Sequence, residues 1–142
     1  MLELAHQRLI PFPRSRVFDA LADVQARVRW WGPDGFTSTS LECDPQPGGV
    51  WRVILHGPDG TDYPNVYRFL EIDRPEKMVI EHPDPVHWFE LCIRCDEAPG
   101  GTLLSWRQRF NSEEHFAAIR EFVAAANEQV LARLEAVVAQ GG

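Results

Sequence analysis

The sequence predicts one α+β domain, residues 1–142, in which a curved antiparallel sheet of seven strands wraps around a long C-terminal helix. Residues 36–110 consist of short apolar–polar alternations divided by turns rich in proline and glycine, a pattern typical of a strand meander. A long amphipathic segment follows, and it has to bury its apolar stripe against the sheet. The length of 142 residues suits a single domain with one core.

The first quarter of the chain predicts a strand and two short helices. Residues 2–11 alternate weakly between apolar and polar and form the first strand. Pro13 opens a short helix, since its fixed φ suits the first helical turn. Asp23 caps a second short helix, which Gly32-Pro33 ends.

Six more strands are predicted at residues 36–44, 50–56, 63–73, 77–82, 87–96 and 102–110. The turns between them have suitable chemistry, because proline presets one turn dihedral and glycine permits positive φ, as in Gly57-Pro58-Asp59-Gly60. Alternation is clearest in the last two strands, which indicates one buried and one solvated face.

The residues after these strands predict the long helix. Asn111 or Ser112 caps it, and two glutamates in its first turn suit the positive end of the helix dipole. Its apolar stripe is formed by Phe116, Ile119, Val123, Val130, Leu134 and Val137. The order of the elements indicates the helix-grip architecture: one strand, two short helices, six strands and a long helix.

Composition excludes several classes of partner. With 14 basic and 21 acidic residues, the net charge is −7 and the basic residues are scattered, which argues against nucleic acid binding. No apolar run reaches membrane-spanning length and no signal-peptide core opens the chain, so we expect no membrane insertion and a cytoplasmic location. Cys92 and Cys95 form a C-x-x-C pair within a predicted strand, where they point to opposite faces, and no second pair accompanies them. We therefore expect neither a redox dithiol nor a metal, and no cofactor.

The inward positions of the strands and the helix predict a pocket for a small hydrophobic molecule. Apolar walls with a few polar groups are typical of such pockets. The candidate ligand-binding residues are Trp51, Val53, Tyr67, Phe69, His82, Phe89, Leu91, Leu104, Trp106, Gln108, Val123 and Asn127. For any one of them, a plain core role is the commoner alternative. Trp30-Trp31 form the pocket entrance, or Trp31 seals the short helices on the sheet and Trp30 is partly exposed.

No catalytic residue is assigned. The chain has no G-x-S-x-G elbow and no glycine-rich phosphate loop before a helix, and none of its three cysteines has an activating neighbour in sequence. His82 is the inward ionisable group of interest, as a hydrogen-bonding group for a ligand or as a general base. A neutral, hydrogen-bonded core histidine is the commoner fate of such a residue.

Five stretches resemble the START-like superfamily, and in it the group similar to the C-terminal domain of the activator of the heat-shock-protein-90 ATPase. They are RVFDALAD with RWWGPDGF within 16–36, DPQPGGVWRV at 44–53, HGPDG at 56–60, FLEIDRPEKMVIEH at 69–82 and GGTLLSWRQRF at 100–110. The resemblance runs from about residue 5 to residue 139. The PGG-x-W pattern, followed by EI-x-x-PE from Glu71 to Glu76, is fairly specific for the group and not for any activity.

The resemblance implies a cavity between sheet and helix, and it leaves three functions open. Relatives hold sterols, lipids, polyketides or plant hormones there, so binding of a small hydrophobic molecule is the first hypothesis. A few relatives perform cyclisation or hydrolysis, which here would involve His82 and Tyr67. The eukaryotic activator binds a chaperone, which makes a chaperone-interacting co-factor the third hypothesis. A homodimer stays open as the oligomeric state.

Overall fold

The structure is a computed structural model that describes residues 2–141, and it has the predicted α+β architecture. The strands are β1 (Glu3–Ile10), β2 (Thr37–Cys43), β3 (Val50–His56), β4 (Asp62–Asp73), β5 (Lys77–His82), β6 (Phe89–Ala98) and β7 (Gly101–Phe110). The helices are α1 (Arg14–Ala22), α2 (Val24–Arg27) and α3 (Glu113–Ala139). Predicted and observed strand ends differ by at most two residues, whereas α2 ends at Arg27, four residues before the end predicted at Gly32-Pro33.

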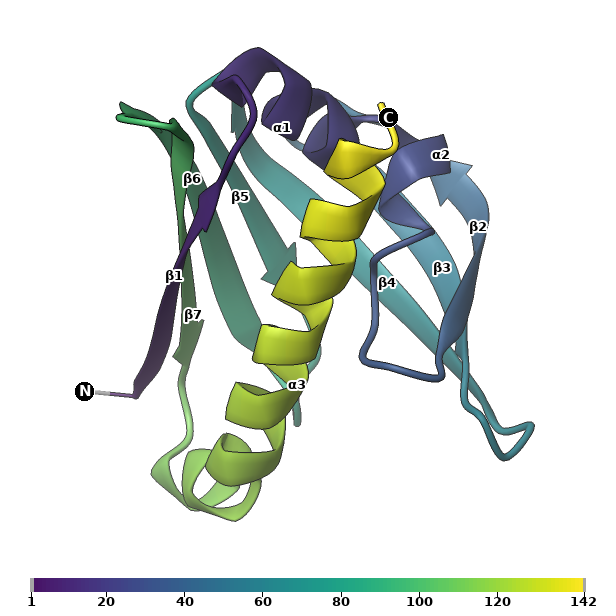
Figure 1. The fold of residues 1–142 in the computed structure, drawn as a ribbon. Coiled ribbons are helices and arrows are strands. Elements are labelled where there is room, and N and C mark those ends of the chain that lie inside the picture. The colour runs from purple at the N-terminus through teal and green to yellow at the C-terminus, as the bar shows by residue number, and fades with distance from the viewer. Residues whose placement is uncertain (1, 142) are drawn as a thin grey trace.

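The seven strands form one antiparallel sheet in the order β1-β7-β6-β5-β4-β3-β2. Every connection from β2 to β7 is therefore a hairpin, and β1 is added beside β7. The sheet is curved, and α3 crosses its hollow face, while α1 and α2 cover one end (Figure 1). This arrangement is the helix-grip fold.

The inner face of the sheet carries the predicted alternation. Trp51, Phe69, Ile93 and Leu104 are fully buried, and Trp106 is nearly so. They form one core with α1 and with Leu131 and Leu134 of α3. Since the alternate residues of each strand face water, the outer face carries ion pairs such as Arg107 with Glu3.

The caps of the helices agree with the sequence. Asp23 accepts a hydrogen bond from the backbone N–H of Gln25 at the start of α2. Ser112, rather than Asn111, caps α3 by accepting from the N–H of His115 at 3.2 Å. Each cap satisfies one backbone donor that the first turn of a helix leaves free.

The helix α3 is buried unevenly along its length. Its C-terminal half buries Val130, Leu131, Leu134, Val137 and Val138, whereas Phe116 is the one buried residue from Glu113 to Ala126. Ile119 and Val123, both on the predicted apolar stripe, are half-buried, and Phe122 is 72% exposed. The N-terminal half of α3 is therefore less closely packed than the C-terminal half, and the candidate site lies near the middle of the helix, at Ala126, Asn127 and Val130.

The burial of Trp30 contradicts one of the two alternatives drawn from the sequence, in which its side chain is partly exposed. Its side chain is fully buried rather than partly exposed. Its indole N–H donates to the carbonyl of Ala20 at 2.9 Å, which fixes the end of α2 against α1. The sequence did not indicate this contact, because Ala20 is ten residues away.

Candidate functional site

A cavity of about 120 Å³ lies between the middle of α3 and the sheet. Four parts of the chain line it: Trp31, Gly32 and Pro33 after α2, Phe89 and Leu91 of β6, Trp106 and Gln108 of β7, and Ala126, Asn127 and Val130 of α3. Most of these side chains are apolar, and none carries a formal charge. A cavity of this kind suits a small, uncharged, largely apolar molecule.

An open groove of about 430 Å³ adjoins the cavity and shares Pro33 and Ala126 with it. Its other walls are Phe36, Leu55, Tyr63, Asn65 and Phe122. Phe122 is 72% exposed and Tyr63 46% exposed, so large apolar side chains face water along this groove. The two hollows thus adjoin each other, and apolar side chains line most of both.

The loop between α2 and β2 is one wall of both hollows, and α3 holds it in place. The guanidinium of Arg133 donates to the carbonyls of Gly32 and Pro33, the latter at 3.0 Å. The backbone N–H of Asp34 donates to Gln129 Oε1 at 3.1 Å. Gly32 has a φ of +110°, a conformation that only glycine adopts without strain. The position of the wall is thus set by contacts to α3 and by the backbone of Gly32.

The polar end of the cavity is organised by a chain of hydrogen bonds. Asn127 Nδ2 donates to Gln108 Oε1 at 3.0 Å and to His6 Nε2 at 3.3 Å. His6 Nδ1 in turn donates to Glu128. Because His6 accepts at one nitrogen and donates at the other, the chain fixes the orientation of both amides. Within residues 2–141, Gln108 Nε2 and Asn127 Oδ1 are left without a protein partner.

Tyr67 and His82 pack against each other beside the cavity, with ring centroids 5.2 Å apart, and neither lines it. The Tyr67 hydroxyl accepts from Trp31 Nε1 at 3.4 Å, and burial raises the pKa of Tyr67 to about 12. His82 Nδ1 donates to the carbonyl of His87 at 2.8 Å. Both residues are therefore hydrogen-bonded members of the packed interior in this structure.

The predicted site residues divide into two groups. The cavity is lined by Phe89, Leu91, Trp106, Gln108 and Asn127. Outside its lining lie Trp51, Val53, Tyr67, Phe69, His82, Leu104 and the half-buried Val123. Trp31, which one of the two alternatives places at the pocket entrance, also lines the cavity. The other lining residues, outside the predicted ligand-binding set, are Gly32, Pro33, Ala126 and Val130. Gly32-Pro33 was interpreted only as a helix stop, and apolar residues on a helical stripe give no signal that separates cavity from core.

A buried arginine lies at the other end of the core. Arg27 is fully buried and stacks over Trp51, with 4.2 Å from its guanidinium carbon to the ring centroid. It donates to the carbonyl of Leu21 at 2.8 Å and to Cys43 Sγ at 3.2 Å. Cys43 thus has a cationic neighbour that local sequence did not indicate. Burial lowers the pKa of Arg27, and backbone carbonyls and aromatic faces stabilise its charge.

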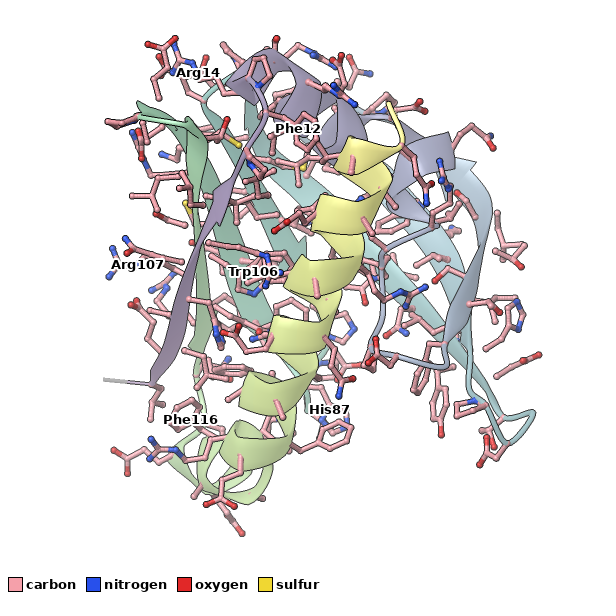
Figure 2. The ribbon with its side chains drawn as sticks, viewed as in Figure 1. Phe12, Arg14, His87, Trp106, Arg107 and Phe116 are labelled. Carbon is pink, nitrogen blue, oxygen red and sulfur yellow. The ribbon has the colours of Figure 1, made fainter. Side chains whose placement is uncertain are left out.

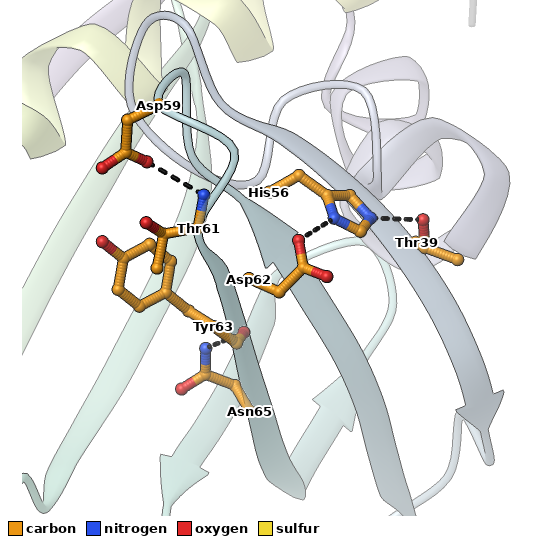
Figure 3. A network of polar contacts seen from close by, with 7 residues as sticks. All are labelled: Thr39, His56, Asp59, Thr61, Asp62, Tyr63 and Asn65. Atoms are coloured by element: carbon orange, nitrogen blue, oxygen red, sulfur yellow. Dashed lines mark hydrogen bonds and ion pairs between the residues drawn. The ribbon is translucent and has the colours of Figure 1, made fainter.

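A hydroxyl–imidazole–carboxylate chain lies at the ends of β2, β3 and β4 (Figure 3). Thr39 donates to His56 Nε2 at 2.7 Å, and His56 Nδ1 donates to Asp62 at 2.7 Å. The order of groups is that of a nucleophilic triad. However, Asp62 is 60% exposed and the three lie on a strand surface away from the cavity, where water competes for each bond. We interpret these hydrogen bonds as links that hold the three strands together.

Neither a metal-binding cluster nor a membrane-spanning helix is present in the part of the chain that the structure describes. No cluster of three or more histidine, cysteine or carboxylate side chains is arranged to hold a metal ion within residues 2–141. No helix in this part of the chain is long and apolar enough to cross a membrane.

Solved structures of bacterial proteins share the fold closely. A protein from Nitrosomonas europaea superposes with a TM-score of 0.89 at 18% identity, covering 99% of this chain and 96% of its own. A protein from Chromobacterium violaceum has a TM-score of 0.86 at 24% identity, with 96% of each chain covered. An AHSA1-like protein from Aeromonas hydrophila has a TM-score of 0.79 at 18% identity, with 97% of this chain and 92% of that chain covered.

Comparison at the level of sequence gives the family. No curated protein matches the chain. The sequence model of the family described as "Activator of Hsp90 ATPase homolog 1-like protein" matches residues 11–139, nearly the whole chain. Taken with the helix-grip fold and the cavity under α3, this match shows that the chain belongs to the Activator of Hsp90 ATPase homolog 1-like family of the START-like superfamily.

Proposed function

We propose that this protein binds a small hydrophobic molecule in the cavity between the sheet and α3. The observation that carries the proposal is the uneven burial of α3. Its C-terminal half is packed like a core helix and its N-terminal half is not, and an uncharged hollow of about 120 Å³, adjoined by an open groove, lies between the middle of the helix and the sheet. A protein that used α3 only for stability would gain by closing this gap, because unfilled space costs packing energy.

The size of the cavity limits what it holds. An apolar cavity of about 150 Å³ accommodates a benzene molecule, so a hollow of about 120 Å³ holds one small ring or a short branched chain. The groove, with Phe36, Leu55 and Phe122 on its walls, accommodates the rest of a longer molecule. The ligand class that fits is thus a compact apolar group with an apolar extension.

The proposal is tested by a screen of lipids and aromatic metabolites with thermal unfolding and native mass spectrometry as readouts. A ligand at 100 times its Kd adds about 2.7 kcal/mol to the free energy of unfolding. For a chain of this length that raises Tm by about 5–10 °C.

Two variants of α3 make a matched pair for this screen. Ala126→Phe places a ring where the cavity meets the groove, while Ala132→Phe places the same ring on an exposed position of the same helix. We expect Ala126→Phe to abolish the thermal shift and Ala132→Phe to retain it. Equal binding by the two variants, or no binding by the wild type, contradicts the proposal.

The other two hypotheses stay predictions. For a cyclase or hydrolase, His82 and Tyr67 would have to reach a bound molecule, and neither lines the cavity in this structure. Turnover of a discovered ligand, lost in His82→Ala, would support that hypothesis. Co-purification of a chaperone would support the third.

A further inference from the structure

The five tryptophans of the chain differ in one respect, the partner of the indole N–H. Four of them donate to a protein acceptor. These acceptors are the Ala20 carbonyl for Trp30, the Tyr67 hydroxyl for Trp31, Ser40 Oγ for Trp51 and Glu81 Oε2 for Trp88. Within the described residues, the buried Nε1 of Trp106 has none. A buried donor without an acceptor costs free energy, so the missing acceptor for the Trp106 indole N–H requires an explanation.

Trp106 is also the tryptophan of β7 that lines the cavity. Its side chain is 4% exposed, and it lies in the space between the sheet and α3 (Figure 2). Its ring packs in an edge-to-face arrangement with Trp30, with ring centroids 6.3 Å apart. The unused donor and the cavity are therefore features of the same side chain.

Gln108 adds a second donor to the same end of the cavity. It lies two residues further along β7, on the same face of the strand as Trp106. Its Oε1 accepts from Asn127, which leaves the Nε2 hydrogens for another acceptor. Two unused donors, Trp106 Nε1 and Gln108 Nε2, therefore belong to side chains that line the cavity, and a carbonyl oxygen has two lone pairs to accept from both. Trp106 Nε1 has almost no accessible surface in this structure, so the indole has to turn for its N–H to reach a molecule in the cavity.

The charges around the cavity argue for an uncharged acceptor. None of its lining residues is an arginine, lysine or histidine. A carboxylate moved from water into such surroundings without a cationic partner is strongly disfavoured. Glu128, which accepts a hydrogen bond from His6, brings a negative charge near the cavity, and the chain as a whole has a net charge of −7. A neutral carbonyl has no charge to desolvate, and the nearby negative charge does not repel it as it would repel a carboxylate.

We propose that the molecule held in this cavity carries a neutral carbonyl group, a ketone or ester, whose oxygen accepts hydrogen bonds from Trp106 Nε1 and Gln108 Nε2. This inference rests on the proposed binding function and names the ligand class for it. The carbonyl lies at the inner end, and the apolar remainder extends past Ala126 toward the groove.

Three probes of nearly equal shape test it. Acetophenone carries the neutral carbonyl, α-methylstyrene replaces its oxygen by a methylene group, and benzoate carries a charged carboxylate. We expect acetophenone to bind about tenfold more tightly than α-methylstyrene, the ratio that corresponds to ~1.4 kcal/mol for one net hydrogen bond to a buried donor. Benzoate should bind more weakly than acetophenone.

The indole N–H resonances of the wild-type protein give a direct readout that needs no variant. Acetophenone and α-methylstyrene carry the same phenyl ring, so ring-current shifts largely cancel when the two complexes are compared. We expect the Trp106 indole proton to lie further downfield with acetophenone than with α-methylstyrene. The indole protons of Trp30, Trp51 and Trp88, which already have protein acceptors, should be the same in both complexes.

Variants at two tryptophans that line the cavity separate hydrogen bonding from shape. Trp106→Phe removes one of the two proposed donors and leaves Gln108 Nε2, so it should lower the affinity ratio of the two probes below the tenfold expected for the wild type. Trp31→Phe also removes an indole from the cavity wall but keeps Trp106, so it should weaken both probes and keep the ratio. If neither probe binds the wild type, the binding function itself fails. If both bind equally and the Trp106 resonance is unchanged, the carbonyl inference alone is wrong.

Discussion

The uneven burial of α3 predicts that two valines of the same stripe differ in their contribution to stability. Val137 is 4% exposed and belongs to the core, whereas Val123 is half-buried in the less closely packed half of the helix. Replacing each by alanine deletes the same groups from the same helix. The comparison therefore measures how closely each half of α3 packs on the sheet.

The magnitudes follow from transfer free energies. Valine to alanine removes two methylene equivalents, about 1.6 kcal/mol when fully buried, and an unfilled cavity adds roughly 1 kcal/mol. Alanine is the better helix former by about 0.5 kcal/mol, which offsets part of the loss in both variants. We therefore expect Val137→Ala to lower the free energy of unfolding by about 2 kcal/mol. For Val123→Ala, which loses about half of the transfer term and leaves little new cavity, we expect a change close to zero.

Urea denaturation followed by circular dichroism measures the difference. The midpoint should fall in Val137→Ala at unchanged m-value, with Tm lower by about 4–8 °C. Leu41→Ala, at a leucine that is 62% exposed, is a control for the loss of apolar surface that is already in water. Equal destabilisation by the two valine variants would refute the reasoning, because it would place the N-terminal half of α3 against the sheet as closely as the C-terminal half.

Replacing Arg133 by Met removes the donors that hold the loop of Gly32 and Pro33 on α3, so hydrogen–deuterium exchange at Asp34 and Phe36 should become faster, with β5 as the internal reference. Unchanged exchange would show that Arg133 does not hold the loop. Ser112→Ala removes the α3 cap and should cost about 1 kcal/mol in urea denaturation, while Ser112→Asp should retain the stability. Burial raises the pKa of Tyr67 to about 12, above the ~10 of an unfolded tyrosine, so the folded state favours the protonated phenol. Its contribution to stability is complete below pH 10 and is lost as pH rises from 10 to 12, and Tyr67→Phe should make that decline shallower.

The fold could be predicted from local patterns because each pattern reflects one physical period. Alternation in residues 87–96 and 102–110 assigned Leu91, Trp106 and Gln108 to the inner face, and the structure places them there. The cap at Ser112 and the turn at Gly57-Pro58-Asp59-Gly60 depend on neighbouring residues only. Such features depend only on residues that are close together in the sequence.

Local sequence patterns did not predict the charged and polar contacts of the interior. Arg27 is on a short helix with other charged residues nearby and has no local signal of burial, yet it is fully buried between Trp51 and Phe69. Its partner Cys43 is 16 residues away. Asn127 and His6, which are 121 residues apart, also meet only in the folded protein. Contacts of this kind depend on how elements are placed, which no short pattern records.

By itself, the sequence determined which side chains face inward, where each helix and strand lies, and that one long helix has to cover the sheet. Val123 and Val137 belong to the same stripe and look alike at that level. Only the tertiary structure decided that the second is packed and the first is half-buried, and that Gly32 and Pro33 of a distant loop line the cavity. The physical reason is that periodicity fixes the direction of a side chain, whereas the distance between two packed elements depends on every residue between them.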